Sequence, residues 1–262
     1  MTGAPSSPAV TAIVLAGSRP GADPLLEGRG VSTKALLPVA GRPMLAHVLG
    51  ALVGHRAVGQ VLVLAQDVRA LQDDPALAGF AGVRFATSGE GISQSVMAAL
   101  DQGAAMPVLL TTADNVLLTG AMIDAFVAGA RGRDIAVGMV ERRVLLAEHP
   151  ESRRTWLKFR SGWWSGANLF WIGSERARPL LERWRAVEQD RKKGMKIVGA
   201  FGPLLLIGAV LRVLTIQQAV ARLGRRLGVS ARVVAMPQAE ACIDVDKPSD
   251  LVLAEVILAR RG

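Results

Sequence analysis

Short apolar runs, each followed by a glycine or polar residues, limit most strongly how this chain can fold. The first run covers residues 10–16 and stops at Gly17, and another at residues 108–112 leads almost directly into Asp114. Uninterrupted apolar runs of this length are typical of strands that are covered on both faces. We expect further strands at residues 60–65, 83–86, 134–140 and 232–236.

Segments with helical character lie between these expected strands. Alternating strands and helices indicate βαβ units and a mostly parallel sheet. Right-handed crossovers then place the loops that follow the strands along one edge, where ligands bind in such sheets. The predicted fold class is α/β, a Rossmann-like three-layer α/β/α arrangement with a mostly parallel central sheet. The expected helices cover residues 43–52, 93–102 with Ser93 as N-cap, 119–130, 174–190, 203–227 and the C-terminus.

The chain is long enough for one large domain. Its 262 residues are 50% hydrophobic and 20% charged, which is a globular composition. No internal repeat or low-complexity linker divides it. The simplest division is one domain over residues 1–262, with residues 141–230 as an inserted subregion.

The formal net charge of +9 fits an anionic ligand, an anionic membrane surface or merely an arginine-rich surface. Zinc-ligand spacing and aromatic–basic alternation are missing, so we expect no nucleic-acid partner. One cysteine, Cys242, and the lack of a secretory signal favour the cytoplasm.

The apolar run at 197–211 is too short and too interrupted to span a bilayer. Residues 197–228 are either core helices or an amphipathic segment that touches anionic lipid at the inner face of the membrane.

Gly17 opens a polar loop that extends to Lys34. A glycine directly after a buried strand lets backbone amides approach phosphate oxygens, and a lysine can add a positive charge there. The spacing matches neither the dinucleotide-binding motif nor the P-loop. A glycine turn alone is weak evidence of a phosphate site, so the assignment depends on the longer pattern around it.

That longer pattern is Leu-Ala-Gly at 15–17, followed by Lys-Ala-Leu-Leu-Pro-Val-Ala-Gly-Arg-Pro-Met-Leu at 34–45. It resembles the signature of nucleotidyltransferases with a glycosyltransferase-A-type fold, including MobA-like NTP transferases, sugar-phosphate nucleotidylyltransferases and cytidylyltransferases of isoprenoid synthesis. The resemblance implies that the loop wraps a triphosphate and that Lys34 contacts it. The loop is longer than usual and lacks a second glycine, so Arg19 and Arg29 both stay candidates for the phosphate-binding arginine. The implied nucleotide-binding residues here are Leu15, Ala16, Gly17, Ser18, Arg19 and Lys34.

Two aspartates are candidate Mg²⁺ ligands. Asp114 follows a buried strand, and magnesium is usually held by one or two carboxylates plus substrate phosphates. The alternative for Asp114 is a cap of the next helix. Residues 243–251 are similar to the Ile-Asp-Thr-Pro-Glu-Asp-Leu element of the same family, and the resemblance places Asp246 as the second carboxylate. Asp244 is ambiguous, and Asp250 is expected to open the last helix.

Two further segments complete the expected site. Residues 88–96 resemble the family's loop beside the nucleobase, so Gly89, Gln94 and Ser95 join Asp114 in the nucleotide-binding set, and Ser95-Val96 favours CTP. Residues 162–170 resemble the stretch near the acceptor, with Asn168 as the acceptor-binding candidate. Plain helix formation and core packing of the tryptophans are the alternatives for these two segments.

Together these features predict a Mg²⁺-dependent nucleotidyltransferase with Lys34, Asp114 and Asp246 as catalytic residues. It would move a nucleoside monophosphate from a nucleoside triphosphate to a phosphorylated small molecule and release pyrophosphate. The alternatives are molybdenum-cofactor guanylyl transfer within the family, a glycosyltransferase of the same fold that uses a sugar nucleotide, and a nucleotide sensor without catalysis. The glycosyltransferases usually carry Asp-x-Asp after the middle strand, where this chain has Ala113-Asp114-Asn115.

Overall fold

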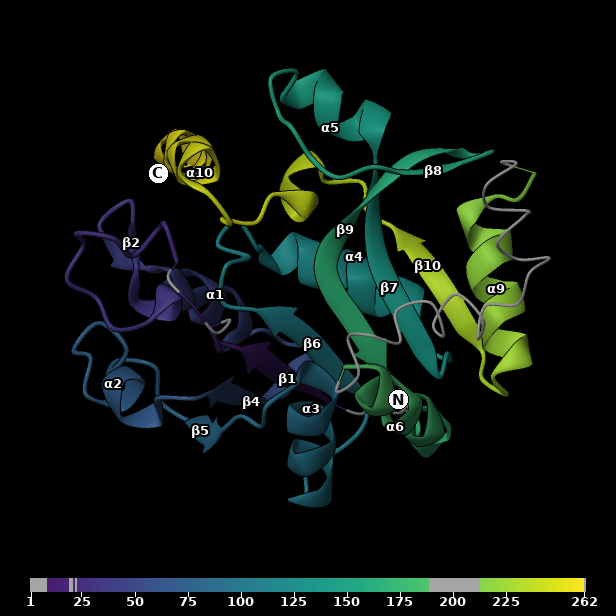
Figure 1. Ribbon diagram of the computed structural model, residues 1–262, viewed down its shortest axis with the longest axis horizontal. Helices are drawn as coiled ribbons and strands as arrows, with labels where there is room; N and C mark the ends of the chain where they lie inside the picture. The colour runs from purple at the N-terminus through teal and green to yellow at the C-terminus, as the bar shows by residue number, and fades with distance from the viewer. Residues whose placement is uncertain (1–8, 19–20, 22, 189–212, 262) are drawn as a thin grey trace, which may run out of the picture.

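A computed structural model describes residues 9–18, 21, 23–188 and 213–261 (Figure 1). One large sheet runs through the molecule in the order β10-β7-β9-β6-β1-β4-β5, with β8 paired to β9. Four neighbouring pairs are parallel, whereas β9 is antiparallel to β6, β7 and β8. The strands are β1 (Val10–Leu15), β4 (Val58–Ala65), β5 (Val83–Thr87), β6 (Val108–Thr112), β7 (Ile135–Glu141), β8 (Leu157–Phe159), β9 (Gly162–Ile172) and β10 (Ala231–Ala235).

Helices cover both faces of this sheet, which confirms the predicted three-layer α/β fold. The helices α1 (Met44–Leu52), α4 (Gly120–Ala130) and α10 (Pro248–Arg261) share one apolar core with the sheet. On the other face lie α3 (Ile92–Asp101), α6 (Arg178–Glu188) and α9 (Ile216–Arg226). The smaller elements are η1 (Lys34–Leu36), β2 (Pro38–Val39), β3 (Arg42–Pro43), α2 (Val68–Gln72), α5 (Arg142–Glu148), η2 (Glu175–Ala177) and η4 (Ala239–Cys242).

The long strand β9 is the main element that the sequence reasoning missed. It lies between β6 and β7 and interrupts the otherwise parallel order. Its sequence was predicted only as an acceptor stretch, because its glycines and tryptophans give no clean apolar run. Ala167, Leu169 and Trp171 alternate along it and fill the core. The strand therefore holds Asn168 beside the end of β6.

Two helix predictions need correction. Ser93 is not the N-cap of α3, because the helix starts one residue earlier and Gly91 takes that position. The sequence predicts a helix at residues 203–227. Within the described part of this range the helix starts only at Ile216, where Thr215 and Gln218 form a capping box. The capping box begins the helix by satisfying its first free amides, so residues 213–215 stay outside it.

The apolar side of α9 faces the sheet. Ile216 and Val220 pack against Met139 and Val233, so this side of the helix forms core. The first part of the stretch that was predicted to touch lipid, residues 197–212, lies outside the described residues. Within the part of the chain that the structure describes, no helix combines the length and the apolar character needed to cross a bilayer.

Candidate active site

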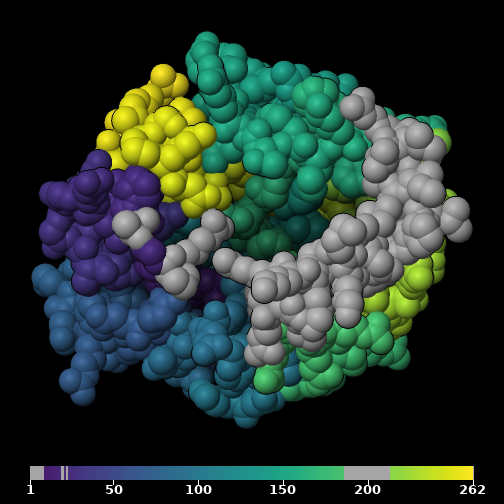
Figure 2. All heavy atoms as spheres, in the orientation of Figure 1, coloured from purple at the N-terminus to yellow at the C-terminus, as the bar shows by residue number. Residues whose placement is uncertain are grey.

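The predicted site residues come from the loops that follow the parallel strands. Gly17 and Ser18 follow β1, Asp114 follows β6, and Gly89 lies two residues beyond β5. Because β1, β4, β5 and β6 are mutually parallel neighbours, these loops lie along one edge of the sheet. Figure 2 shows the surface hollowed between the purple N-terminal region, the yellow C-terminal helix and the green region that contains β9.

Lys34, Asp114 and Asp246 meet although they are far apart in the sequence. The Lys34 Nζ donates to Asp114 Oδ2 at 2.9 Å and to Asp246 Oδ1 at 2.7 Å. The Thr112 hydroxyl donates to the other oxygen of Asp114 at 2.6 Å, which fixes that carboxylate. The backbone also joins the two carboxylate loops, since the Val245 N–H donates to the Asp114 carbonyl at 3.1 Å. Sequence reasoning placed all three residues in one centre, and the structure brings them together.

The charge of Lys34 is stabilised by this setting. Burial alone would lower the pKa of the ammonium, but Asp114 and Asp246 outweigh burial and raise the pKa above its ordinary value. Lys34 therefore stays a cation at neutral pH. Its side chain is only 16% exposed, so the ammonium sits within the site and can meet a phosphate there.

The donor set suits a small hard cation completed by a substrate. Asp114 and Asp246 each place an oxygen within 3 Å of the same nitrogen, so one cation bound there can reach both carboxylates. Among the described residues, no cluster of three or more His, Cys, Asp or Glu is placed to hold a metal. Magnesium commonly uses one or two carboxylates and takes further ligands from phosphates and water. The residues present fit that mode of binding.

The Gly17–Ser18 turn is held by Gln66, which follows β4 and which sequence reasoning missed. The Gln66 Oε1 accepts from the Ser18 N–H at 2.9 Å, and its Nε2 donates to the Ser18 carbonyl at 3.0 Å. A Cβ at Gly17 would come within 3.1 Å of the Gln66 amide, so glycine keeps this contact close. Of the two candidate loop arginines, Arg19 lies outside the described residues, and Arg29 is exposed in a turn closed by the Leu26 carbonyl.

The loop before α3 is closed by Ser95. Its hydroxyl accepts from the Gly89 N–H at 2.9 Å and donates to the Gly91 carbonyl at 2.7 Å. A Cβ at Gly89 would come within 3.0 Å of the Gln94 side chain, so these two residues are also in contact. The hydroxyl oxygens of Ser18 and Ser88 are buried and make no hydrogen bond within the described part of the chain. Buried polar atoms of this kind are usually satisfied by a ligand or by water.

Asn168 lies beside the carboxylates but contacts the one that the sequence left ambiguous. Its Nδ2 donates to Asp244 Oδ2 at 2.8 Å, and its backbone has a positive φ of 49°. Burial, followed by the charges of Asp246 and Asp114, raises the pKa of the Asp244 carboxyl. Three carboxylates therefore share this corner of the site.

Arg154 is the second residue that sequence reasoning missed. It lies between α5 and β8, and its side chain is only 8% exposed. Its guanidinium donates to the carboxylate and carbonyl of Asp244, and to Asp250 Oδ1 at 3.3 Å. Asp250 opens α10 as predicted. A buried arginine in a segment without a motif gives no local signal, so only the fold could identify Arg154.

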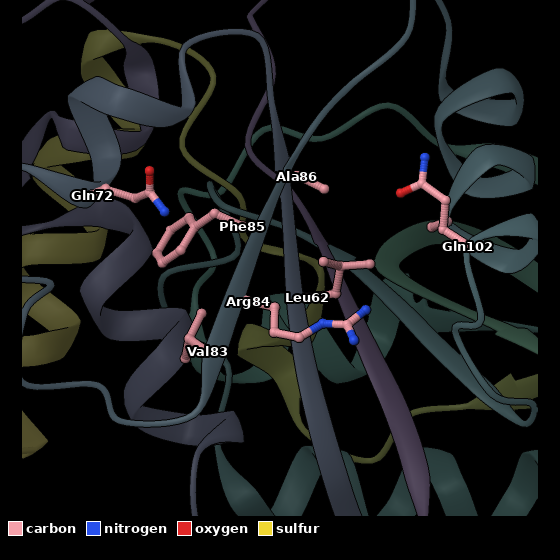
Figure 3. Close-up of a pocket in the computed structure, with 8 residues that line it drawn as sticks. Leu62, Gln72, Val83, Arg84, Phe85, Ala86 and Gln102 are labelled. Carbon is pink, nitrogen blue, oxygen red and sulfur yellow. The ribbon is translucent and has the colours of Figure 1, made fainter.

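A cavity of about 450 Å³ elsewhere contains none of the predicted site residues. It lies at β5, the last strand of the sheet order (Figure 3). Phe85 and Gln72 lie on one side of this strand, and Leu62, Ala86 and Gln102 lie on the other. The residues that line the cavity therefore lie on both sides of the edge strand, and they include no cluster of reactive side chains.

Comparisons with known proteins concern the family and the fold of the chain. The model of the MobA-like NTP transferase domain matches residues 12–200. A solved structure described as a hypothetical transferase from Thermus thermophilus is 28% identical, covers 93% of this chain and 99% of its own, and has a TM-score of 0.78. The comparison with curated proteins gave no significant match.

Two solved cytidylyl-transferring enzymes share the fold. The 2-C-methyl-D-erythritol 4-phosphate cytidylyltransferase from Thermus thermophilus is 20% identical, with coverage of 96% and 99% and a TM-score of 0.55. The CMP:2-keto-3-deoxy-manno-octonic acid synthetase complexed with CTP is 16% identical, with coverage of 98% and 100% and a TM-score of 0.60.

Proposed function

Because this chain belongs to the MobA-like NTP transferase family, we propose that it transfers a nucleoside monophosphate from CTP to a phosphorylated small molecule. A phosphate oxygen of the acceptor would attack the α-phosphorus. The bond from the α-phosphorus to the bridging oxygen would break, and pyrophosphate would leave. A phosphate acceptor is already an anionic nucleophile, so the reaction needs no dedicated general base, and positioning and electrostatics carry the rate.

The observation that carries this proposal is the convergence of Lys34, Asp114 and Asp246. Asp114 and Asp246 would hold Mg²⁺, which when bound neutralises charge on the triphosphate. Lys34 would then exchange its two carboxylate partners for a phosphate oxygen and keep its positive charge. The backbone of Gly17 and Ser18 would approach the phosphates, and Asn168 would orient the acceptor.

The choice of CTP rests on the loop before α3. Ser95 shapes this loop through its hydrogen bonds to Gly89 and Gly91, and Ser95-Val96 resembles the cytidylyltransferases. The hydroxyls of Ser18 and Ser88 are buried and make no hydrogen bond to the residues that the structure describes, which supports a ligand at the ends of β1 and β5. The molybdenum-cofactor alternative would use GTP in the same place, so a comparison of nucleotides separates the two.

A glycosyltransferase of the same fold is the rival from another class. The structure places a single aspartate, Asp114, after β6, and its partner Asp246 comes from the far end of the chain. A sugar-nucleotide enzyme would release a nucleoside diphosphate or monophosphate, whereas the proposed reaction releases pyrophosphate. The product therefore decides between the two classes.

A substrate screen tests the proposal. Purified protein is incubated with Mg²⁺, each of the four NTPs and a panel of sugar and polyol phosphates, and pyrophosphate is measured. We expect release with CTP and one acceptor class, and a nucleotidylated acceptor by mass spectrometry. Tight nucleotide binding without pyrophosphate from any pair would contradict the enzyme proposal and favour a nucleotide sensor.

We also propose a cytoplasmic location. Cys242, the single cysteine of the chain, is buried, and one reduced thiol suits a reducing compartment. Contact with an anionic membrane through residues 197–212 stays a prediction, since those residues lie outside the described part of the chain.

A further inference from the structure

Arg154 joins the segment between α5 and β8 to the 244–250 loop, which carries Asp244, Asp246 and Asp250. It comes from the segment between α5 and β8, and its partners Asp244 and Asp250 lie about a hundred residues later in the chain. Its Nη1 donates to the Asp244 carboxylate, and both Nη atoms donate to the Asp244 carbonyl at 3.2 Å. Its Nη2 also donates to Asp250 at 3.3 Å. One guanidinium thus serves a backbone carbonyl and two carboxylates.

Asp250 links Arg154 to Asp246 through a hydrogen bond. The second oxygen of the Asp250 carboxylate accepts from the Asp246 N–H at 3.3 Å, and Asp250 is buried. The side chain of Asp246 in turn meets Lys34. Arg154 therefore acts on the backbone around Asp246 in two ways. It contacts the Asp244 carbonyl directly, and it reaches the Asp246 N–H through Asp250.

The electrostatics explain why such a connection is needed. Asp244 and Asp246 lie two residues apart in this loop, and Asp246 shares Lys34 with Asp114, so several negative charges gather at one place. The buried Arg154 binds Asp244 and Asp250 and so places a positive charge against this loop. The planar guanidinium reaches several acceptors at fixed angles, which a lysine cannot do.

We propose that Arg154 is a positioning residue that holds the 244–250 loop so that Asp246 faces Lys34 and Asp114. This inference rests on the proposed function for its catalytic consequence. Its structural part, the ordering of the loop, stands independently of any reaction.

Three variants test the proposal: Arg154→Met, Arg154→Lys and, as the matched control, Arg153→Met at the exposed neighbouring position. Hydrogen exchange of residues 243–251 is measured in the ligand-free protein. We expect Arg154→Met to speed exchange of the Val245 and Asp246 amides by about tenfold, with Arg154→Lys in between and the control unchanged. Unchanged exchange in folded Arg154→Met would overturn the proposal.

Kinetics of the same variants separate positioning from general stability. Loss of an outer residue that orients metal-binding carboxylates costs roughly 10–100-fold in activity or metal affinity. We expect Arg154→Met to lower kcat, and to raise the Mg²⁺ concentration that activity requires, by this factor. The KM for the nucleotide should stay close to that of the wild type. A loss that only follows the fraction of unfolded protein would contradict the positioning role.

Failure of the two proposals can be told apart. If the wild type releases no pyrophosphate, the proposed function fails, and the exchange data still decide whether Arg154 orders the loop. If Arg154→Met does not fold, Arg154→Lys and Asp250→Asn provide the same comparison, because each weakens one part of the same connection. Wild-type exchange in both of these would reject the proposal.

Discussion

At the scale of single residues, Lys34 is the most informative position. Its ammonium lies where two carboxylates converge, which is where a bound cation would also lie. Replacement by methionine should therefore have two effects. Turnover should fall by roughly 100-fold or more, as for loss of a charged group that stabilises the transition state. Mg²⁺ alone should raise the Tm of Lys34→Met more than that of the wild type, because no ammonium competes with the ion.

Differential scanning fluorimetry with and without Mg²⁺ measures the second effect, and pyrophosphate release measures the first. Arg69→Met, on the exposed surface of α2, serves as the control for loss of one positive charge. Equal Mg²⁺ responses in Lys34→Met and the wild type would show that the ion and the ammonium do not share a place.

Cys242 gives a prediction about reactivity. Burial raises the pKa of its thiol to about 12, so almost no thiolate is present at neutral pH. The native protein should leave a thiol reagent such as dithionitrobenzoate unconsumed at pH 8, and the unfolded protein should consume one equivalent. Rapid labelling of the native protein would mean that η4 opens readily.

Residue-scale prediction from the sequence depended on motifs. Lys34, Asp114 and Asp246 lie in segments whose order of residues resembles a family signature, and the structure brings all three together. Gln66 and Arg154 lie in no such segment, and each acts through contacts far along the chain. Such contacts depend on the fold, so local sequence contains no trace of them.

At the scale of elements, the end of β9 shows how tightly the sheet is packed. A Cβ at Gly173, just after the strand, would clash with the Arg133 carbonyl and the Trp171 indole. Within the strand, a Cβ at Gly166 would meet no atom within 4 Å. Gly173→Ala should therefore lower the free energy of unfolding by about 2 kcal/mol or more, and Gly166→Ala should leave it nearly unchanged. Urea unfolding of both variants checks this, and equal midpoints would contradict the packing.

Asp134 joins the starts of β7 and β10 to the turn after β9. It accepts from the Ser230 N–H and hydroxyl at 2.7 Å each, and from the Ser174 hydroxyl. The Ser174 hydrogen bond, and then that of the Ser230 amide, lower the pKa of this carboxyl. The charged form thus stabilises the fold above pH 3.8, and this contribution is lost as the pH falls through the lowered pKa.

Asp134→Asn should destabilise the protein at pH 7 by roughly 1 kcal/mol, the usual net worth of one or two hydrogen bonds. The difference from the wild type should shrink below pH 3.8, the ordinary pKa of the group. Thermal unfolding followed from pH 7 to pH 3 measures it. A difference that stays constant over this range would show that the charge of Asp134 plays no part.

The strands β1, β4 and β6 could be predicted from their apolar runs, because burial on both faces leaves a simple pattern. The antiparallel β9 could not, since its position in the sheet is set by pairing with β6 and β7 and not by its own composition. The prediction of Ser93 as the N-cap of α3 was also wrong, because contacts outside the helix itself set where it begins. Gly91 is the N-cap, and the Ser95 hydroxyl closes the loop before the helix.

At the scale of the whole molecule, the fold explains why distant motifs form one site. The parallel order of β1, β4, β5 and β6 places their following loops along one edge, and β9 holds Asn168 beside them. The last motif reaches the same edge because η4 and α10 pack into the core that α1 and α4 share. The net charge of +9 suits the anionic substrates that such an edge would bind.

We propose that Asp114 and Asp246 form, with Lys34, a centre for metal-dependent nucleotidyl transfer. The most direct test measures pyrophosphate release with Mg²⁺ and the best substrate pair for Asp114→Ala, Asp246→Ala and the wild type, each checked for folding by circular dichroism. We predict turnover in the wild type, abolished by chelation of Mg²⁺, and no detectable turnover in either folded variant. Retained activity in both variants would contradict the assignment of the two carboxylates.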